Sequence, residues 1–237
     1  VQDLEAVPTP PREHGTVHTG IGITSHAAVP QAAALANAAD ILNRGERVAM
    51  LVGAGALAAG NEVRAVAERL GAGVAKALLG KAVLPDALPY VTGAIGLVGT
   101  QPSWEMMNEC DTLLMVGTSF PYAEFLPREG QARAVQIDVD GRQLSLRYPV
   151  EVGLVGDARL TLEALLPLLE PKASSRWRER IEKHVQRWHE TVTARAMVQA
   201  RPVNPQRPFL ELSSRLPPHA IVCLLYTSDA ADEGLGV

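Results

Sequence analysis

The sequence predicts an α/β protein with a doubly wound parallel sheet, and three observations point to this fold class. Short, almost entirely apolar segments alternate with longer helical segments between residues 30 and 170, as in parallel sheets that are covered by helices on both faces. Hydrophobic residues make up 47% of the 237 residues and aromatic residues only 4%, so small aliphatic side chains must fill the core. Small-residue loops follow several apolar segments, as they do where parallel strands face a ligand.

The strands are predicted where apolar residues run together and turn residues follow. Residues 47–52 are nearly all apolar and lead into Gly53-Ala-Gly55, which predicts a strand buried on both faces and then a turn. Pro85 and Pro89 predict a loop that precedes the segment 93–103. The same reasoning predicts four further strands, at residues 73–76, 112–116, 134–139 and 150–155.

Helices are predicted between these strands, at residues 31–43, 58–70, 104–110 and 156–169. Residues 174–199 form a longer amphipathic pattern with a charged outer face, and we interpret it as a helix that packs on a domain surface or on a neighbouring subunit. Its apolar residues recur every three or four positions: Trp177, Ile181, Val185, Trp188 and Val192. After it we expect a proline-rich linker at 201–208, a helix at 209–216 and the first residues of a strand at 220–222.

The composition excludes several classes of protein. A net charge of −4 argues against non-specific nucleic-acid binding, and no apolar run approaches the ~18 residues of a transmembrane helix. The first residues resemble neither a signal peptide nor a transit peptide. Cys110 and Cys223 have no metal-ligand spacing and give no reason to expect a disulfide, so we expect no metal site in this chain and a reducing, cytoplasmic environment. The chain does not begin with Met, and we expect it to be a piece of a longer protein.

Three segments carry the strongest indication of a ligand. They are the small-residue segment 93–103, the strand and turn at 113–122, and the strand at 135–139 that contains an acidic residue near its end. Glycine lets a backbone approach phosphates, and a carboxylate at a strand end can accept hydrogen bonds from ribose hydroxyls. The candidate cofactor-binding residues are Ile95, Gly96, Leu97, Val98, Thr118, Ser119, Phe120, Pro121, Tyr122 and Asp138.

Each candidate also has a purely structural interpretation. The glycines of the first segment could serve a packed loop, the Phe-Pro pair could simply end the strand, and Asp138 could cap the following segment. Gly53-Ala-Gly55 suits phosphate binding at a helix start, but Lys76 stands where a dinucleotide fingerprint would place an acid. Lys76 and Lys81 are weaker candidates for a cofactor phosphate, because solvated surface lysines are common.

Residues 1–222 resemble the interior of thiamine-diphosphate-dependent enzymes of the pyruvate oxidase and acetolactate synthase group. The resemblance divides the chain into the end of a pyrimidine-binding domain with a linker (1–29), a central FAD- or nucleotide-binding-type domain (30–170), a helical linker (171–208) and the truncated start of a diphosphate-binding domain (209–222). Residues 223–237 instead resemble a translated sequencing adaptor, and no function is assigned to them.

Within this group, the residues favour the branch of pyruvate oxidase and quinone-dependent pyruvate dehydrogenase. Ile95-Gly-Leu-Val98 resembles its first flavin-contacting loop, Thr118-Ser-Phe-Pro-Tyr122 resembles its second, and Asp138 corresponds to its acid on the adenosine side. The acetolactate synthase branch usually carries an Arg-Phe-Asp-Asp-Arg-like run after the corresponding glycine, which this chain lacks.

The resemblance implies oxidative decarboxylation of a 2-oxo acid such as pyruvate, with FAD in the central domain and quinone or oxygen as the electron acceptor. It implies thiamine diphosphate and Mg²⁺ bound by domains outside this chain, and a homotetramer or homodimer that is membrane-peripheral if it is quinone-linked. The family's activating glutamate and its Gly-Asp-Gly…Asn motif are absent from residues 1–222. We therefore name no catalytic residue and expect this chain alone to be inactive.

Two other functions stay open. An acetolactate synthase-like enzyme or a 2-oxo acid decarboxylase of the same superfamily would keep the fold of the central domain, with a flavin that is structural or absent. A nucleotide-binding module without catalysis is an alternative of another class.

Overall fold

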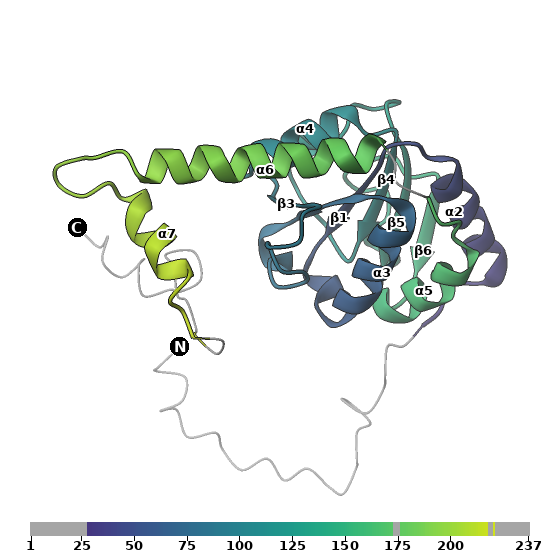
Figure 1. Ribbon diagram of the computed structural model, residues 1–237. Helices are drawn as coiled ribbons and strands as arrows, with labels where there is room; N and C mark the ends of the chain where they lie inside the picture. The colour runs from purple at the N-terminus through teal and green to yellow at the C-terminus, as the bar shows by residue number, and fades with distance from the viewer. Residues whose placement is uncertain (1–27, 173–175, 218–219, 221–237) are drawn as a thin grey trace, which may run out of the picture.

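The computed structural model describes residues 28–172, 176–217 and 220, and six strands lie within this part of the chain. They are β1 (Val48–Val52), β2 (Gly73–Lys76), β3 (Val91–Ala94), β4 (Thr112–Val116), β5 (Arg133–Asp138) and β6 (Val152–Val155). All pair in parallel in the order β3-β2-β1-β4-β5-β6. This is the predicted doubly wound sheet (Figure 1).

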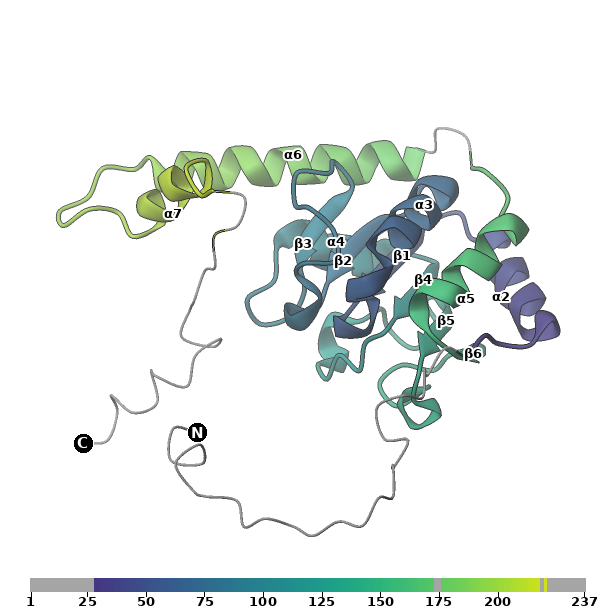
Figure 2. The ribbon, with the colours of Figure 1, turned by 90° about the horizontal axis from the view of Figure 1, so that it is seen from below.

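Helices cover both faces of the sheet (Figures 1 and 2). The first layer contains α2 (Ala32–Arg44), α3 (Gly60–Leu70) and α5 (Ala158–Leu165), and the second contains α4 (Gln101–Glu109) and the first half of α6 (Arg176–Ala196). A last helix, α7 (Gln206–Ser213), follows the end of α6. Both views show the second half of α6 extending past the sheet together with α7.

Side chains from the central strands fill two separate cores. Along β1, Val48, Met50 and Val52 point toward the first helical layer, whereas Ala49 and Leu51 point toward the second. All five are 0% exposed. This division follows from the two-residue period of a strand, and it explains why a strand that is buried on both faces has a continuous apolar sequence.

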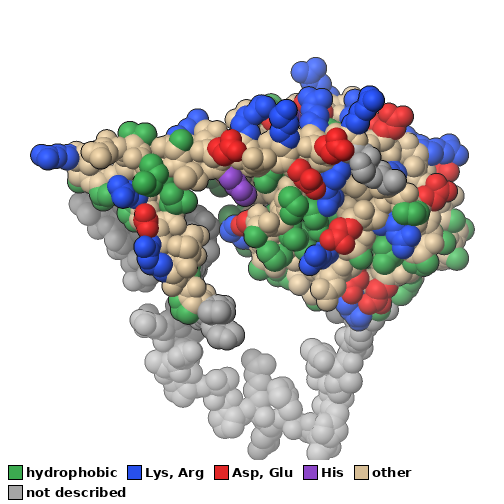
Figure 3. Space-filling view, viewed as in Figure 1, with side chains coloured by type: hydrophobic (Ala, Val, Ile, Leu, Met, Phe, Trp, Pro, Cys, Tyr) green, Lys and Arg blue, Asp and Glu red, His purple; other side chains and the backbone are tan. Residues whose placement is uncertain are grey.

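The first half of α6 is part of the second core. Trp177, Ile181 and Val185 are buried there, and the indole Nε1 of Trp177 donates a hydrogen bond of 2.9 Å to the carbonyl oxygen of Val48. On its outer side the helix exposes Arg176, Arg180, Lys183 and Arg187, and Lys and Arg side chains gather along this edge of the molecule (Figure 3). Over its first half, the amphipathic pattern therefore corresponds to a helix that packs on the domain, whereas Trp188 and Val192 in the second half are only partly buried.

The predicted and observed elements differ at several points. The structure has a strand, β3, where we expected a loop. The sequence did not predict it, because its four residues include a glycine and follow Pro89 too closely to give an alternating pattern. Helix α4 begins three residues early, since Thr100 caps it and proline is tolerated in a first turn. Helix α7 begins inside the expected linker because proline is tolerated in the first turn of a helix, and Pro208 is its third residue.

Some expectations fall on residues that the structure does not describe. These are the end of the pyrimidine-binding domain and most of its linker within 1–29, the strand expected at 220–222 apart from Ala220, and the adaptor-like segment 223–237. Among the residues that are described, no helix is both long enough and apolar enough to cross a bilayer.

The order of the strands in the sheet indicates where a ligand-binding site is expected. The sequence of strands reverses between β1 and β4, which are neighbours although β2 and β3 come between them in the chain. Connections leave the carboxyl ends of β1 and β4 in opposite directions, and a crevice opens between them. In open α/β sheets this crevice is where ligands bind.

Candidate ligand-binding site at the carboxyl edge of the sheet

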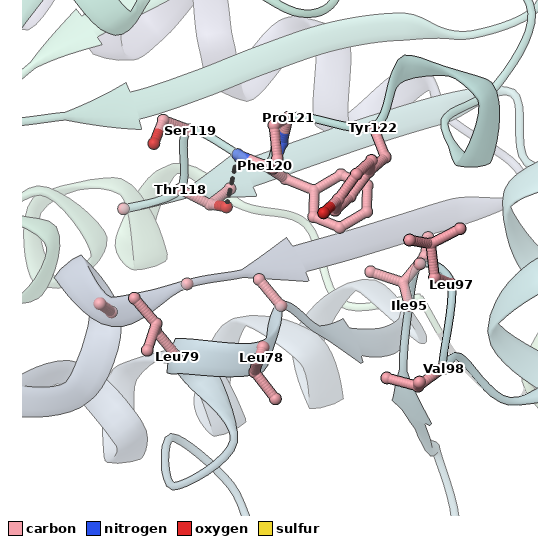
Figure 4. A pocket seen from close by; sticks show the side chains of 15 residues that line it. Leu78, Leu79, Ile95, Leu97, Val98, Thr118, Ser119, Phe120, Pro121 and Tyr122 are labelled. Atoms are coloured by element: carbon pink, nitrogen blue, oxygen red, sulfur yellow. Dashed lines mark hydrogen bonds between the residues drawn. The ribbon is translucent and has the colours of Figure 1, made fainter. Parts of the chain in front are cut away.

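A pocket of about 470 Å³ lies in this crevice. Four loops line it, each directly after one of the strands β1 to β4. The lining residues are Gly53, Ala54, Ala77, Leu78, Leu79, Ile95, Gly96, Leu97, Val98, Gly117, Thr118, Ser119, Phe120, Pro121 and Tyr122. In Figure 4, Leu78 and Leu79 lie on one side of the pocket, the segment from Thr118 to Tyr122 lies opposite, and the loop with Ile95, Leu97 and Val98 closes one end.

The walls of the pocket are apolar and partly open to solvent. Leu79, Leu97 and Val98 are 75%, 74% and 78% exposed, so one pocket presents three largely exposed aliphatic side chains. The rings of Phe120 and Tyr122 meet edge to face with their centroids 5.6 Å apart. Such a surface suits a planar, largely apolar group that covers it.

The polar groups of the pocket are the hydroxyls of Thr118, Ser119 and Tyr122 and several backbone groups. Thr118 Oγ1 accepts a hydrogen bond of 3.2 Å from the backbone N–H of Phe120, and Gln136 Nε2 donates to the carbonyl of Thr118 at 3.3 Å, so the turn after β4 is held in place. The backbone N–H groups of Thr118, Ser119 and Leu97 have no acceptor within the described part of the chain. They are therefore available to a ligand that carries hydrogen-bond acceptors.

Two glycines, Gly55 and Gly117, let the loops after β1 and β4 approach each other closely at the crevice. Gly117 has a φ of +57°, and a Cβ at this position would lie 2.5 Å from the carbonyl carbon of Gly55. Gly55 N–H donates to the Gly117 carbonyl at 3.0 Å. The loops after β1 and β4 thus touch backbone to backbone, so these glycines are explained by packing without any contact to a phosphate.

The structure brings nine of the ten candidate residues into this one pocket. Both expected loops, Ile95 to Val98 and Thr118 to Tyr122, line it in full. Asp138 does not line it: the residue is 9% exposed at the end of β5, and its Oδ1 accepts a 2.9 Å hydrogen bond from the Asp140 N–H. This contact matches the capping interpretation of Asp138, and a contact to ribose stays a prediction.

The two lysines that could have met a phosphate are held elsewhere. Lys76 is 1% exposed, and its Nζ pairs with Asp86 at 2.5 Å, while Lys81 pairs with the other oxygen of the same carboxylate. Burial lowers the pKa of Lys76 below its ordinary value, and this effect outweighs the pairing with Asp86, which by itself would raise that pKa. The lining of the pocket contains neither lysine, and none of its residues is charged.

Sequence reasoning missed one wall of the pocket. Ala77, Leu78 and Leu79 follow β2 directly and line the pocket, although no glycine or polar residue among them marked a ligand site. Their position could still have been inferred, because residues just after a central parallel strand lie at the carboxyl edge whatever their type.

No cluster of metal-ligating side chains occurs among the residues that the structure describes. Burial also raises the pKa of the Cys110 thiol to about 12, so this cysteine is a buried core residue rather than a nucleophile.

Three relatives of known sequence are similar to this chain. A Bacillus subtilis protein described as thiamine pyrophosphate-containing is 34% identical over 75% of this chain and 31% of its own length. A Pseudomonas aeruginosa protein named as a 2-ketoarginine decarboxylase is 41% identical, over 61% of this chain and 26% of its own length. The pyruvate oxidase of Lactiplantibacillus plantarum is 25% identical, over 87% of this chain and 34% of its own length. The chain therefore spans about a third or less of the length of these relatives.

A solved structure from Mycobacterium smegmatis, described as a thiamin diphosphate-dependent enzyme, superposes on 64% of this chain and 30% of its own with a TM-score of 0.54 and 25% identity. The family described as the central domain of thiamine pyrophosphate enzymes matches residues 35–165, which include the whole sheet and every loop of the pocket. The chain belongs to this family: it contains the central domain of a thiamine pyrophosphate (thiamine diphosphate) enzyme.

Proposed function

We propose that the pocket at the carboxyl edge binds FAD, and that the protein is a thiamine-diphosphate-dependent, FAD-linked pyruvate oxidase or quinone-dependent pyruvate dehydrogenase. The observation that carries the proposal is the meeting of both expected flavin loops in one apolar pocket at the switch point of the sheet. When bound, FAD would supply a two-electron acceptor for the oxidative decarboxylation of a 2-oxo acid.

The residues fit a flavin in two respects. The aliphatic and aromatic walls match a planar ring system, and the N–H groups of the lining residues Thr118, Ser119 and Leu97 have no acceptor among the described residues and could bind carbonyl or phosphate oxygens of a ligand. The run Thr118 to Tyr122 contains no arginine, which favours the oxidase branch over the acetolactate synthase branch. The pyruvate oxidase relative, which aligns over 87% of this chain, supports the same choice.

The wider assembly follows from this proposal. Thiamine diphosphate and Mg²⁺ would bind to domains that this chain does not contain, and the complete protein would form a homotetramer or homodimer. It would act in the cytoplasm, or at a membrane surface if its acceptor is a quinone.

A second candidate is a 2-oxo acid decarboxylase or acetolactate synthase-like enzyme of the same superfamily. One structural observation favours the decarboxylase: no lysine or arginine lines the pocket, so a cofactor diphosphate would meet only backbone N–H groups and side-chain hydroxyls there. The relative named as a 2-ketoarginine decarboxylase also has the higher identity, at 41%.

Titration of the 237-residue chain with FAD separates the flavin-binding candidates from a flavin-free decarboxylase. We expect quenching of flavin fluorescence that saturates at one FAD per chain. A Leu97→Asp variant should bind at least about tenfold more weakly, because a carboxylate in the apolar wall must be desolvated and repels the diphosphate. Leu168→Asp is the matched control, since Leu168 is also exposed but does not line the pocket. Its carbonyl accepts a hydrogen bond from Asn43.

Two results would redirect the assignment. Absence of saturable flavin binding by the unaltered chain would leave the flavin-free decarboxylase. Flavin that binds to the complete protein but keeps its visible absorption when pyruvate and thiamine diphosphate are added without oxygen would point to an acetolactate synthase-like enzyme.

A further inference from the structure

A buried lysine holds the connection between β2 and β3, which forms one wall of the pocket. Lys76 ends β2, and its Nζ donates to the carbonyl oxygens of Lys81 at 3.0 Å and Leu84 at 2.8 Å. The third partner is Asp86 Oδ1, at 2.5 Å. An ammonium group has three N–H donors, so each of them has an acceptor within this connection.

The wall is held by its own turn and by contacts on either side of it: the N–H groups of Gly80 and Lys81 donate to the carbonyls of Ala77 and Leu78 at 2.9 and 3.2 Å, and Val83 and Leu84 are buried in the first core. Leu78 and Leu79 are 46% and 75% exposed, so they bury little surface that could hold their own segment. Upstream, the Ala77 N–H donates to the carbonyl of Val52 at 2.9 Å. Downstream, the carbonyls of Lys81 and Leu84 are attached to the buried ammonium. The two leucines thus lie between two fixed points, and Lys76 contributes to the second together with the buried side chains of Val83 and Leu84.

Stability alone does not call for a lysine at this place. Moving an ammonium out of water is costly, and a buried ion pair often contributes no more to stability than apolar residues of similar volume. The ammonium instead contributes a defined geometry, because its three donors hold three particular oxygen atoms of the connection in place. Asp86 extends the arrangement by pairing with Lys81 through its second oxygen.

We propose that Lys76 is a positioning residue for the pocket: by holding the connection between β2 and β3, it keeps Leu78 and Leu79 against a bound ligand. This inference rests on the proposed binding of FAD at the same site. If the wall moves so that the ligand covers about 50 Å² less leucine surface, the expected loss of affinity is about tenfold.

The test compares Lys76→Met with Lys81→Met in the 237-residue chain. Both variants remove an ammonium that pairs with Asp86, but only the first removes the donors to the carbonyls of Lys81 and Leu84. We expect backbone amide hydrogen exchange at residues 78–84 to accelerate in Lys76→Met and to stay near that of the unaltered chain in Lys81→Met. FAD affinity should fall about tenfold in the first variant and less than about twofold in the second.

A purely structural role would give another result. Val63→Ala removes buried volume from α3 in the first core, away from the pocket lining, and lowers stability without touching the connection. If Lys76→Met and Val63→Ala lower the melting temperature alike and leave FAD affinity alike, the positioning role is refuted. Asp86→Asn provides a milder variant should Lys76→Met not fold, and it should show the same two effects in smaller size.

The two proposals can fail separately. If the unaltered chain does not bind FAD, the proposed function fails, and the exchange rates at residues 78–84 still decide whether Lys76 fixes the wall. If FAD binds but exchange at these residues does not change in Lys76→Met, the function stands and the role of Lys76 is refuted.

Discussion

Replacing Gly117 by alanine tests the backbone contact that sets the width of the crevice. The residue has a φ of +57°, a conformation that costs a residue with a Cβ about 1–2 kcal/mol. The new methyl group would also lie 2.5 Å from the carbonyl carbon and 2.6 Å from the Cα of Gly55, whereas carbon atoms normally pack about 3.5–4.0 Å apart. The two loops must separate by roughly 1 Å, and overpacking of this kind costs about 1–3 kcal/mol.

A second glycine isolates the steric part of this cost. Gly130 also has a positive φ, of +79°, but a Cβ there would meet nothing within 4 Å. Gly130→Ala should therefore lose only the conformational cost of about 1–2 kcal/mol. Gly117→Ala should lose about 2–5 kcal/mol, the sum of both.

Urea unfolding of the two variants, followed by circular dichroism, measures the difference directly. We expect Gly117→Ala to be less stable than Gly130→Ala by about 1–3 kcal/mol, and we expect only the first to weaken FAD binding, since the turn at Thr118 lines the pocket. A difference below about 0.5 kcal/mol, which is the range of neutral substitutions, would show that the loops after β1 and β4 do not meet as described.

Three other predictions concern the core and the ion pairs. Trp177→Phe removes the donor to the Val48 carbonyl and should cost about 1–3 kcal/mol in urea unfolding; an unchanged midpoint would contradict the packing of α6. Burial alone would raise the pKa of Asp86, but hydrogen bonds from two lysines outweigh it and hold this pKa below 3.8. Its stabilising contribution is thus present above pH 3.8 and is lost as the pH falls below it, so melting temperatures from pH 6 to pH 2.5 should fall less steeply in Asp86→Asn. Cys110, with a pKa of about 12, should react with iodoacetamide at pH 8 only after unfolding in a Cys223→Ser chain, and rapid labelling of the folded chain would contradict its burial.

The sequence by itself determined the fold class and most of the elements. Strands such as β1 and β4 are buried on both faces, so each had to be a short run of apolar residues. Helix α6 buries only one face, and its apolar residues therefore had to recur every three or four positions. These patterns are local, because each is a direct consequence of how one element meets the core.

The tertiary structure alone decided which residues share a site. Ile95 and Thr118 are far apart in the chain but line the same pocket, because β3 and β4 end at the same edge of the sheet. Leu78 and Leu79 joined them without any motif, since their role depends on position rather than residue type. Asp138 had the expected residue type but satisfies its carboxylate locally. Lys76, which looked like a surface lysine, is buried because its three acceptors come from a loop whose path no local pattern specifies.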